Sequence, residues 1–129
     1  MRKFSLPFAL AFALISAVAL ADPDKKVAQF DQLSASGVSG EVRLNPMPQG
    51  GTRIQSQIEG LVPNTEYVSV IFADGTCGGG EIIEVTTFTA NPAGTAVYNQ
   101  RVDLELSEIH SVSVQLASDL TFAACANTE

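Results

Sequence analysis

The chain has 129 residues, 46% of them hydrophobic, and a formal net charge of −7 at pH 7. A chain of this length and composition forms one domain with a real hydrophobic core. Its acidic balance argues against nucleic acids and anionic membrane surfaces as partners, because like charges repel.

The first 21 residues have the features of a secretory signal peptide. Arg2 and Lys3 give a short positive start, an apolar stretch follows over 8–20, and Ala19-Leu20-Ala21 is a typical cleavage site. The apolar stretch is too short to span a bilayer comfortably as a helix. Cleavage removes two of the 7 basic residues and none of the 14 acidic ones, which leaves a net charge of −9. We therefore expect a periplasmic or secreted protein with no membrane insertion after cleavage.

The mature chain keeps two cysteines, Cys77 and Cys125. Two cysteines in an exported protein most often form a disulfide, and two unrelated buried thiols are the alternative. No C-x-x-C motif is present, so thiol exchange has no support in the sequence.

The segment 22–36 is mixed and polar. Val27, Phe30 and Leu33 have helix-like spacing, which predicts a lead-in or a single helical turn ahead of a domain that spans residues 37–129.

From Val38 onward the hydrophobic pattern has a period of two, which is typical of half-buried strands. Turns containing Pro, Gly and Asn separate these runs. The segment 104–109 is predicted to run along the surface, and the predicted strands are 38–44, 54–58, 67–72, 82–89, 95–102, 112–116 and 120–126. The fold class is therefore all-β, an antiparallel β-sandwich or flattened barrel of about seven or eight strands.

The segment 61–67 resembles the L-x-P-x-T-x-Y tyrosine corner of fibronectin type III domains, which are immunoglobulin-like sandwiches. Leu61, Pro63 and Tyr67 form this structural corner, in which the tyrosine hydroxyl bonds back to the preceding turn. The family has its corner late in the domain and usually buries a Trp, whereas 62 residues follow Tyr67 here and the chain has no Trp. A fibronectin type III-like adhesion or assembly module is therefore an alternative interpretation.

A longer resemblance, to the copper/zinc superoxide dismutase family, covers most of the mature chain. The motifs occur in the order of that family: V-x-G-x-V at 38–42, I-x-G-L-x-P at 58–63, T-A-x-x-x-G-x-A at 89–96, and a late strand ending in Ala-Cys at 120–125. The resemblance implies an eight-stranded Greek-key sandwich. It also implies a bond between Cys77, in the loop after 67–72, and Cys125.

The resemblance does not extend to the metal ligands of the family. Such enzymes hold copper and zinc with several histidines and one Asp, whereas this chain has a single histidine, His110. An alignment without gaps from Gly60 places the H-x-H ligand positions on Ser69 and Ile71, which we interpret as lost metal-ligand positions. A further ligand position falls near Val114, and His110 lies outside all of them.

Other candidate chemistry is weak. Asp74, Glu81 and Glu84 flank the glycine run 78–80, but their spacing does not supply the six or more oxygens of a calcium site. We interpret them as a solvated acidic edge. Ser69 has no base in the sequence placed to activate it as a nucleophile.

The sequence thus predicts an exported, non-catalytic domain without a cofactor, which resembles a metal-free superoxide dismutase. It would recognise an unknown protein or small ligand as a binding or structural module of the cell envelope or extracellular space. The alternative from another class is a degenerate copper/zinc-binding protein that holds metal with carboxylates, His110 and Met47. Sheet edges favour self-pairing, so a homodimer also stays open.

Overall fold

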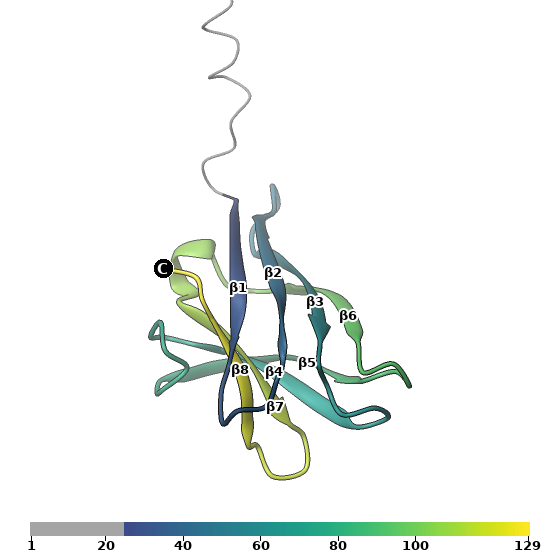
Figure 1. Ribbon diagram of the computed structural model, residues 1–129. Helices are drawn as coiled ribbons and strands as arrows, with labels where there is room; N and C mark the ends of the chain where they lie inside the picture. The colour runs from purple at the N-terminus through teal and green to yellow at the C-terminus, as the bar shows by residue number, and fades with distance from the viewer. Residues whose placement is uncertain (1–24) are drawn as a thin grey trace, which may run out of the picture.

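The computed structural model describes residues 25–129, and the predicted signal peptide lies outside this range. Eight strands form one antiparallel sheet in the order β5-β4-β7-β8-β1-β2-β3-β6 (Figure 1). Their bounds are β1 Lys26–Gln32, β2 Ser39–Pro46, β3 Thr52–Glu59, β4 Glu66–Phe72, β5 Glu81–Thr89, β6 Ala96–Val102, β7 Ser111–Leu116 and β8 Phe122–Asn127. The predicted all-β antiparallel fold is confirmed.

The sheet curls into a nearly closed barrel with two halves (Figure 1). We call β1, β2, β3 and β6 the open half, and β5, β4, β7 and β8 the covered half. Hydrogen bonds between β1 and β8 join the two halves on one side, whereas β5 and β6 end the sheet order and form no ladder with each other. The chain crosses between the halves after β3, β5 and β6, which is the Greek-key arrangement.

The first strand corrects one prediction. The segment 26–32 is not a lead-in or a helical turn, because β1 pairs with both β2 and β8. Ala28 and Phe30 point into the core, while the side chain of Val27 is 54% exposed. The domain therefore begins by Lys26 instead of residue 37. The period-two signal was weak because the small Ala28 occupies one of the inward positions.

The remaining predicted strands agree with β2 to β8 to within a few residues. The predicted surface segment contains the 3₁₀ helix η1, Leu106–Glu108. The backbone N–H of Glu105 donates to Glu108 Oε1 at 2.8 Å and caps this turn. Within residues 25–129, no helix is long and apolar enough to cross a membrane.

The core between the two halves contains a row of aromatic rings. Tyr67 stacks on Phe88 with centroids 5.9 Å apart, and Phe88 meets Tyr98 at 5.5 Å. The hydroxyl of Tyr98, on β6, lies 2.7 Å from Ser69 Oγ, on β4, so a buried hydrogen bond connects the halves. Burial raises the pKa of Tyr98 because ionised phenolate is poorly solvated there, although the bond to Ser69 opposes this effect.

The predicted tyrosine corner is present at the start of β4. The backbone N–H of Val62 donates to Tyr67 Oη at 3.0 Å, and both Tyr67 and Leu61 are buried. Pro63 lies in the turn between these partners and remains exposed. The corner therefore fixes the chain where it crosses from the open half to the covered half.

Candidate functional site

Three strands of the covered half, β4, β7 and β8, are buried on both faces, whereas the edge strand β5 is largely exposed. In β4, β7 and β8 consecutive residues are buried, whereas β3 alternates between buried and more exposed positions. One face of the covered half packs into the barrel core. The other, which we call the outer face, carries Val68, Val70, Phe72, Ser111, Ser113 and Gln115.

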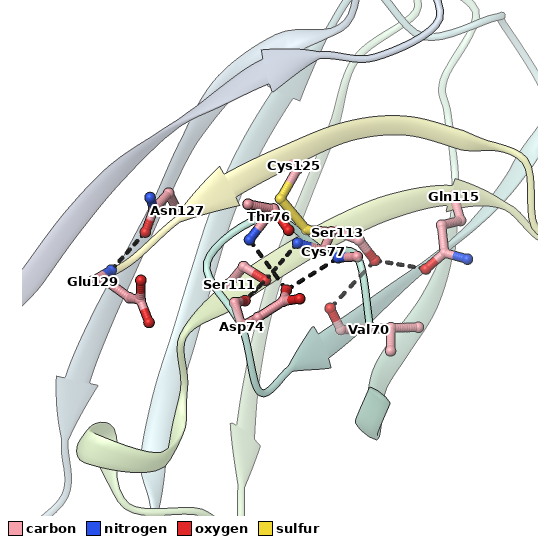
Figure 2. The surroundings of a disulfide bond; sticks show 11 residues. Val70, Asp74, Thr76, Cys77, Ser111, Ser113, Gln115, Cys125, Asn127 and Glu129 are labelled. Carbon is pink, nitrogen blue, oxygen red and sulfur yellow. Dashed lines mark hydrogen bonds between the residues drawn. A yellow bond between two sulfur atoms is a disulfide. The ribbon is translucent and has the colours of Figure 1, made fainter. Parts of the chain in front are cut away.

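A disulfide closes over the outer face. Cys77 Sγ and Cys125 Sγ are 2.08 Å apart, which confirms the predicted pairing. Both cysteines are buried and pack against Val68, Val70 and Phe72, with Leu33 and Phe122 at the side. The bond ties the loop 73–80 to β8, so that loop forms a fixed cover over the sheet (Figure 2).

Polar groups hold the covering loop in place. Asp74 Oδ1 accepts the backbone N–H groups of Gly78 at 3.0 Å and Thr76 at 3.2 Å. The Gly78 bond, followed by the Thr76 bonds, holds the pKa of Asp74 below its ordinary value. Ser111 Oγ donates to the Asp74 carbonyl and accepts the Cys77 N–H at 3.1 Å (Figure 2). The loop is therefore fixed from β7 as well as through its disulfide.

The row of polar side chains on β7 continues toward the β7–β8 turn. Ser113 Oγ donates to Gln115 Oε1 at 2.7 Å (Figure 2). Gln115 Nε2 donates to the Leu120 carbonyl at 3.2 Å. These polar groups are buried and each has a partner, as buried polar groups require. None of these hydroxyls has a neighbouring base in its hydrogen-bond set, so the row anchors the turn and offers no nucleophile.

The positions aligned with the family's H-x-H ligands point into the barrel. Ser69 and Ile71 are both 0% exposed, Ser69 bonds to Tyr98, and Ile71 belongs to the main core. Val114 faces the same way. Their assignment as lost ligand positions stays an interpretation, since it depends on the alignment. Neither the inward nor the outward side chains of β4 include an imidazole or a carboxylate beyond the exposed Glu66 at its start.

The residues present do not fit copper or zinc. In the described part of the chain, no group of three or more His, Cys, Asp or Glu could hold a metal ion. His110 Nδ1 lies 2.7 Å from Glu129 Oε2, and Met47 lies in the turn between β2 and β3. Imidazole and thiolate are the ligands that copper and zinc prefer, and both cysteine sulfurs are joined in the disulfide. The alternative metal site built on His110 and Met47 gains no geometric support.

A hollow of about 180 Å³ opens on the outer face beside β5. We call it the β5 hollow. It is lined by Val68, Val70, Glu81, Glu84, Thr87, Gln115, Ala117 and Leu120. Glu81 and Glu84 are exposed, and neither forms an ion pair within residues 25–129. Sequence reasoning saw these two residues only as an acidic edge, because the pairing that brings them together is not visible in the sequence.

A second hollow, of about 160 Å³, lies on the outside of the open half and differs in the pairing of its charges. Val97 and Tyr98 supply apolar surface beside its polar side chains, and its charges are already paired, since Arg43 Nε meets Glu41 Oε2 at 2.7 Å. The β5 hollow differs from it in that its two carboxylates, Glu81 and Glu84, have no ion pair within residues 25–129, which makes it the stronger of these two candidates for binding a charged group.

No family model matches the sequence, and a search of curated proteins gives no match. Among solved structures, the chain is similar to superoxide dismutase 5 from Candida albicans in its copper(II) form, with a TM-score of 0.59 and 14% identity over 80% of this chain and 89% of that one. Two variants of the same fungal protein give TM-scores of 0.59 at 14% identity and 0.54 at 15% identity. Both cover 80% of this chain, and 88% and 89% of their own. At such identity the similarity shows the fold alone, which is superoxide dismutase-like.

Proposed function

We propose that this protein is an exported, non-catalytic module that binds a protein partner on a superoxide dismutase-like scaffold. The observation that carries the proposal is the composition of the outer face. Valine, phenylalanine, serine and glutamine side chains and a disulfide fill it, and a fixed loop covers it. The packed face holds its margin at β5 rigid, and that accessible margin would be the surface for recognition. Fold alone does not bring an activity with it.

Two features support export to the periplasm or the extracellular space. The N-terminal 21 residues have the pattern of a signal peptide. The buried disulfide belongs to the class that persists in oxidising compartments, because cytosolic reductants keep most thiols reduced. Mass spectrometry of the protein from its native compartment is expected to show cleavage after Ala21 and no free thiol.

The charge of the chain also disfavours dismutation. Superoxide is an anion, and the mature chain has 14 acidic residues against 5 basic ones. Strands β5, β4, β7 and β8 contain no Lys or Arg at all, so the covered half has no cation on its strands to attract an anionic substrate. Clefts that attract an anionic substrate are lined by positive charge, because local positive potential raises the rate of encounter.

The decisive experiment combines metal analysis with a dismutase assay. Oxidised mature protein from its native compartment is analysed for copper and zinc, then assayed before and after incubation with both metals. We expect far less than one metal ion per chain and no turnover above buffer. Stoichiometric metal with turnover, both lost in His110→Ala, would overturn the proposal and establish the degenerate metal site instead.

A further inference from the structure

Two acidic side chains reach the β5 hollow because of an irregularity in β5. Val70 lies opposite Glu84 and Phe72 opposite Glu81, so β5 contains one more residue than β4 over this stretch, and the register shifts at Ile82. A second shift, at Val85, lies just beyond it. Residues three apart in a regular strand point to opposite faces of the sheet. The bulge instead turns Glu81 and Glu84 to the same outer face.

No cation of the covered half compensates these two carboxylates. The ion pairs among residues 25–129 involve other acidic residues. The basic residues on strands all belong to the open half: Lys26, Arg43, Arg53 and Arg101. Two like charges on neighbouring positions of one face are unfavourable, and a cation placed between them removes the repulsion.

The floor and size of the β5 hollow suit one long side chain. Val68 and Val70 are each 4% exposed and form an apolar floor, and the Leu120 side chain, 54% exposed, stands at the rim. The bond from Gln115 Nε2 fixes the Leu120 backbone. A volume of about 180 Å³ is below the range of sites for drug-sized ligands, roughly 300–1,000 Å³. Lys and Arg have an apolar stem with a charged tip, which matches this lining.

The neighbouring edge of the sheet favours an extended chain as the source of that side chain. β5 ends the sheet order and pairs only with β4, and its first four residues, 81–84, are all exposed. An edge strand offers free backbone N–H and C=O groups, to which an extended segment can add as a further strand. Side chains of that segment would lie opposite Glu81 and Glu84, where opposite charges are stabilising.

We propose that an extended basic segment of a partner protein binds along the exposed part of β5 and seats a lysine or arginine side chain in the β5 hollow between Glu81 and Glu84. The proposal rests on the proposed function as a binding module and names the surface and the chemistry of the partner. A free amine is the competing kind of ligand.

The test uses oxidised mature protein and a fluorescent peptide of alternating lysine and valine, capped at both ends. Fluorescence anisotropy measures its affinity for the protein and for the double variant Glu81→Gln/Glu84→Gln. The matched control, Asp31→Asn/Glu59→Gln, removes two exposed carboxylates from the open half. We expect about tenfold weaker binding for the first variant, from two partly exposed charge pairs, and about the same affinity as wild type for the control.

Two further probes separate the chemistry of the segment from charge alone. The same peptide with norleucine in place of lysine is expected to lose most of the affinity, and free 1,5-diaminopentane is expected not to compete at concentrations that match the peptide. An equal effect of both double variants, or unchanged binding of the norleucine peptide, would overturn the proposal. Effective competition by the diamine would overturn the protein segment as the ligand and identify a small amine as the ligand of the β5 hollow.

The peptide-binding experiment and the metal and dismutase experiment test the β5 hollow and the non-catalytic role separately. An inactive, metal-free protein that does not bind the peptide loses only the β5 hollow as a site. A protein with metal and turnover loses the non-catalytic role, whatever its affinity for the peptide.

Discussion

The two halves of the barrel share one sheet but differ in their construction. The open half has one packed face, with buried residues such as Ile54 alternating with more exposed ones such as Gln55. The covered half has two packed faces along β4, β7 and β8, and in β4 every residue after Glu66 is buried, whereas its edge strand β5 stays largely exposed. A small second hydrophobic cluster, the loop 73–80 and the disulfide cover its outer face, where the open half is in contact with solvent. One sheet thus supports both a two-layer and a three-layer arrangement within a single small domain.

The difference between the halves separates a surface that is packed and structural from a margin that is accessible for binding. An outer face that is covered by a fixed loop and filled with valine and serine side chains is rigid, and only its margin at β5 stays accessible. The margin is where the bulge, the unpaired carboxylates and the free strand edge coincide. Rigid surroundings with one accessible edge are suited to recognition, because little order has to be gained on binding.

The largest expected effect comes from removing the disulfide that defines the covered half. Its cysteines are 48 residues apart, and the chain-entropy model gives about 4 kcal/mol for a loop of this size. We expect Cys77→Ser/Cys125→Ser to lower the free energy of unfolding by about 2–4 kcal/mol, measured by urea denaturation.

The matched control for this variant is the reductant itself. Adding a reductant to the wild-type protein should lower its free energy of unfolding to that of the double variant. The same reductant should not change the free energy of unfolding of the double variant. Hydrogen exchange should then accelerate in β7 and β8 before it does in β2 and β3. Equal stability of the wild type and the double variant would mean that the covered half does not depend on its disulfide.

A pair of outward-facing valines tests the two halves directly. Val70 on β4 is 4% exposed and Val97 on β6 is 72% exposed, although both point away from the barrel core. We expect Val70→Ala to cost about 2 kcal/mol, since it leaves a cavity in the second cluster. Val97→Ala should stay within about 0.5 kcal/mol. Similar losses in thermal or urea unfolding would contradict the distinction between a covered and an open half.

The sequence predicted the repeating features of the fold well. Strands β2 to β8 have clear alternation or β-branched runs, and the corner motif placed Tyr67 correctly. β1 was missed because Val27, Phe30 and Leu33 imitate helical spacing, whereas pairing with β2 and β8 decides its structure. Local pattern was sufficient only where no distant strand had to override it.

The candidate site could not be predicted from the sequence, because it also depends on pairing between distant strands. The bulge that turns Glu81 and Glu84 to one face is defined by the pairing of β5 with β4. No residue type in β5 predicts it. Burial of β4 on both faces likewise depends on the loop that Cys77 fixes. The single histidine, in contrast, is a matter of composition, and the expectation that this chain builds no dismutase metal site stays a prediction.

The smallest expected effect concerns the carboxylate that orders the covering loop. Backbone N–H groups of Gly78 and Thr76 donate to Asp74, and its pKa is lowered in the folded protein. A lowered pKa stabilises the fold above the ordinary carboxyl pKa, about 3.9, and this contribution disappears as the pH falls through the lowered value. Asp74→Asn keeps an oxygen acceptor but removes the charge. The melting temperature of the variant should therefore be slightly lower than wild type near neutral pH, and the difference should vanish in acid. Asp31→Asn, on β1 of the open half, removes a carboxylate that accepts no hydrogen bond within residues 25–129, so it should show no such convergence. A constant offset between Asp74→Asn and wild type over the whole pH range would show that the loop depends on the shape of the side chain and not on its charge.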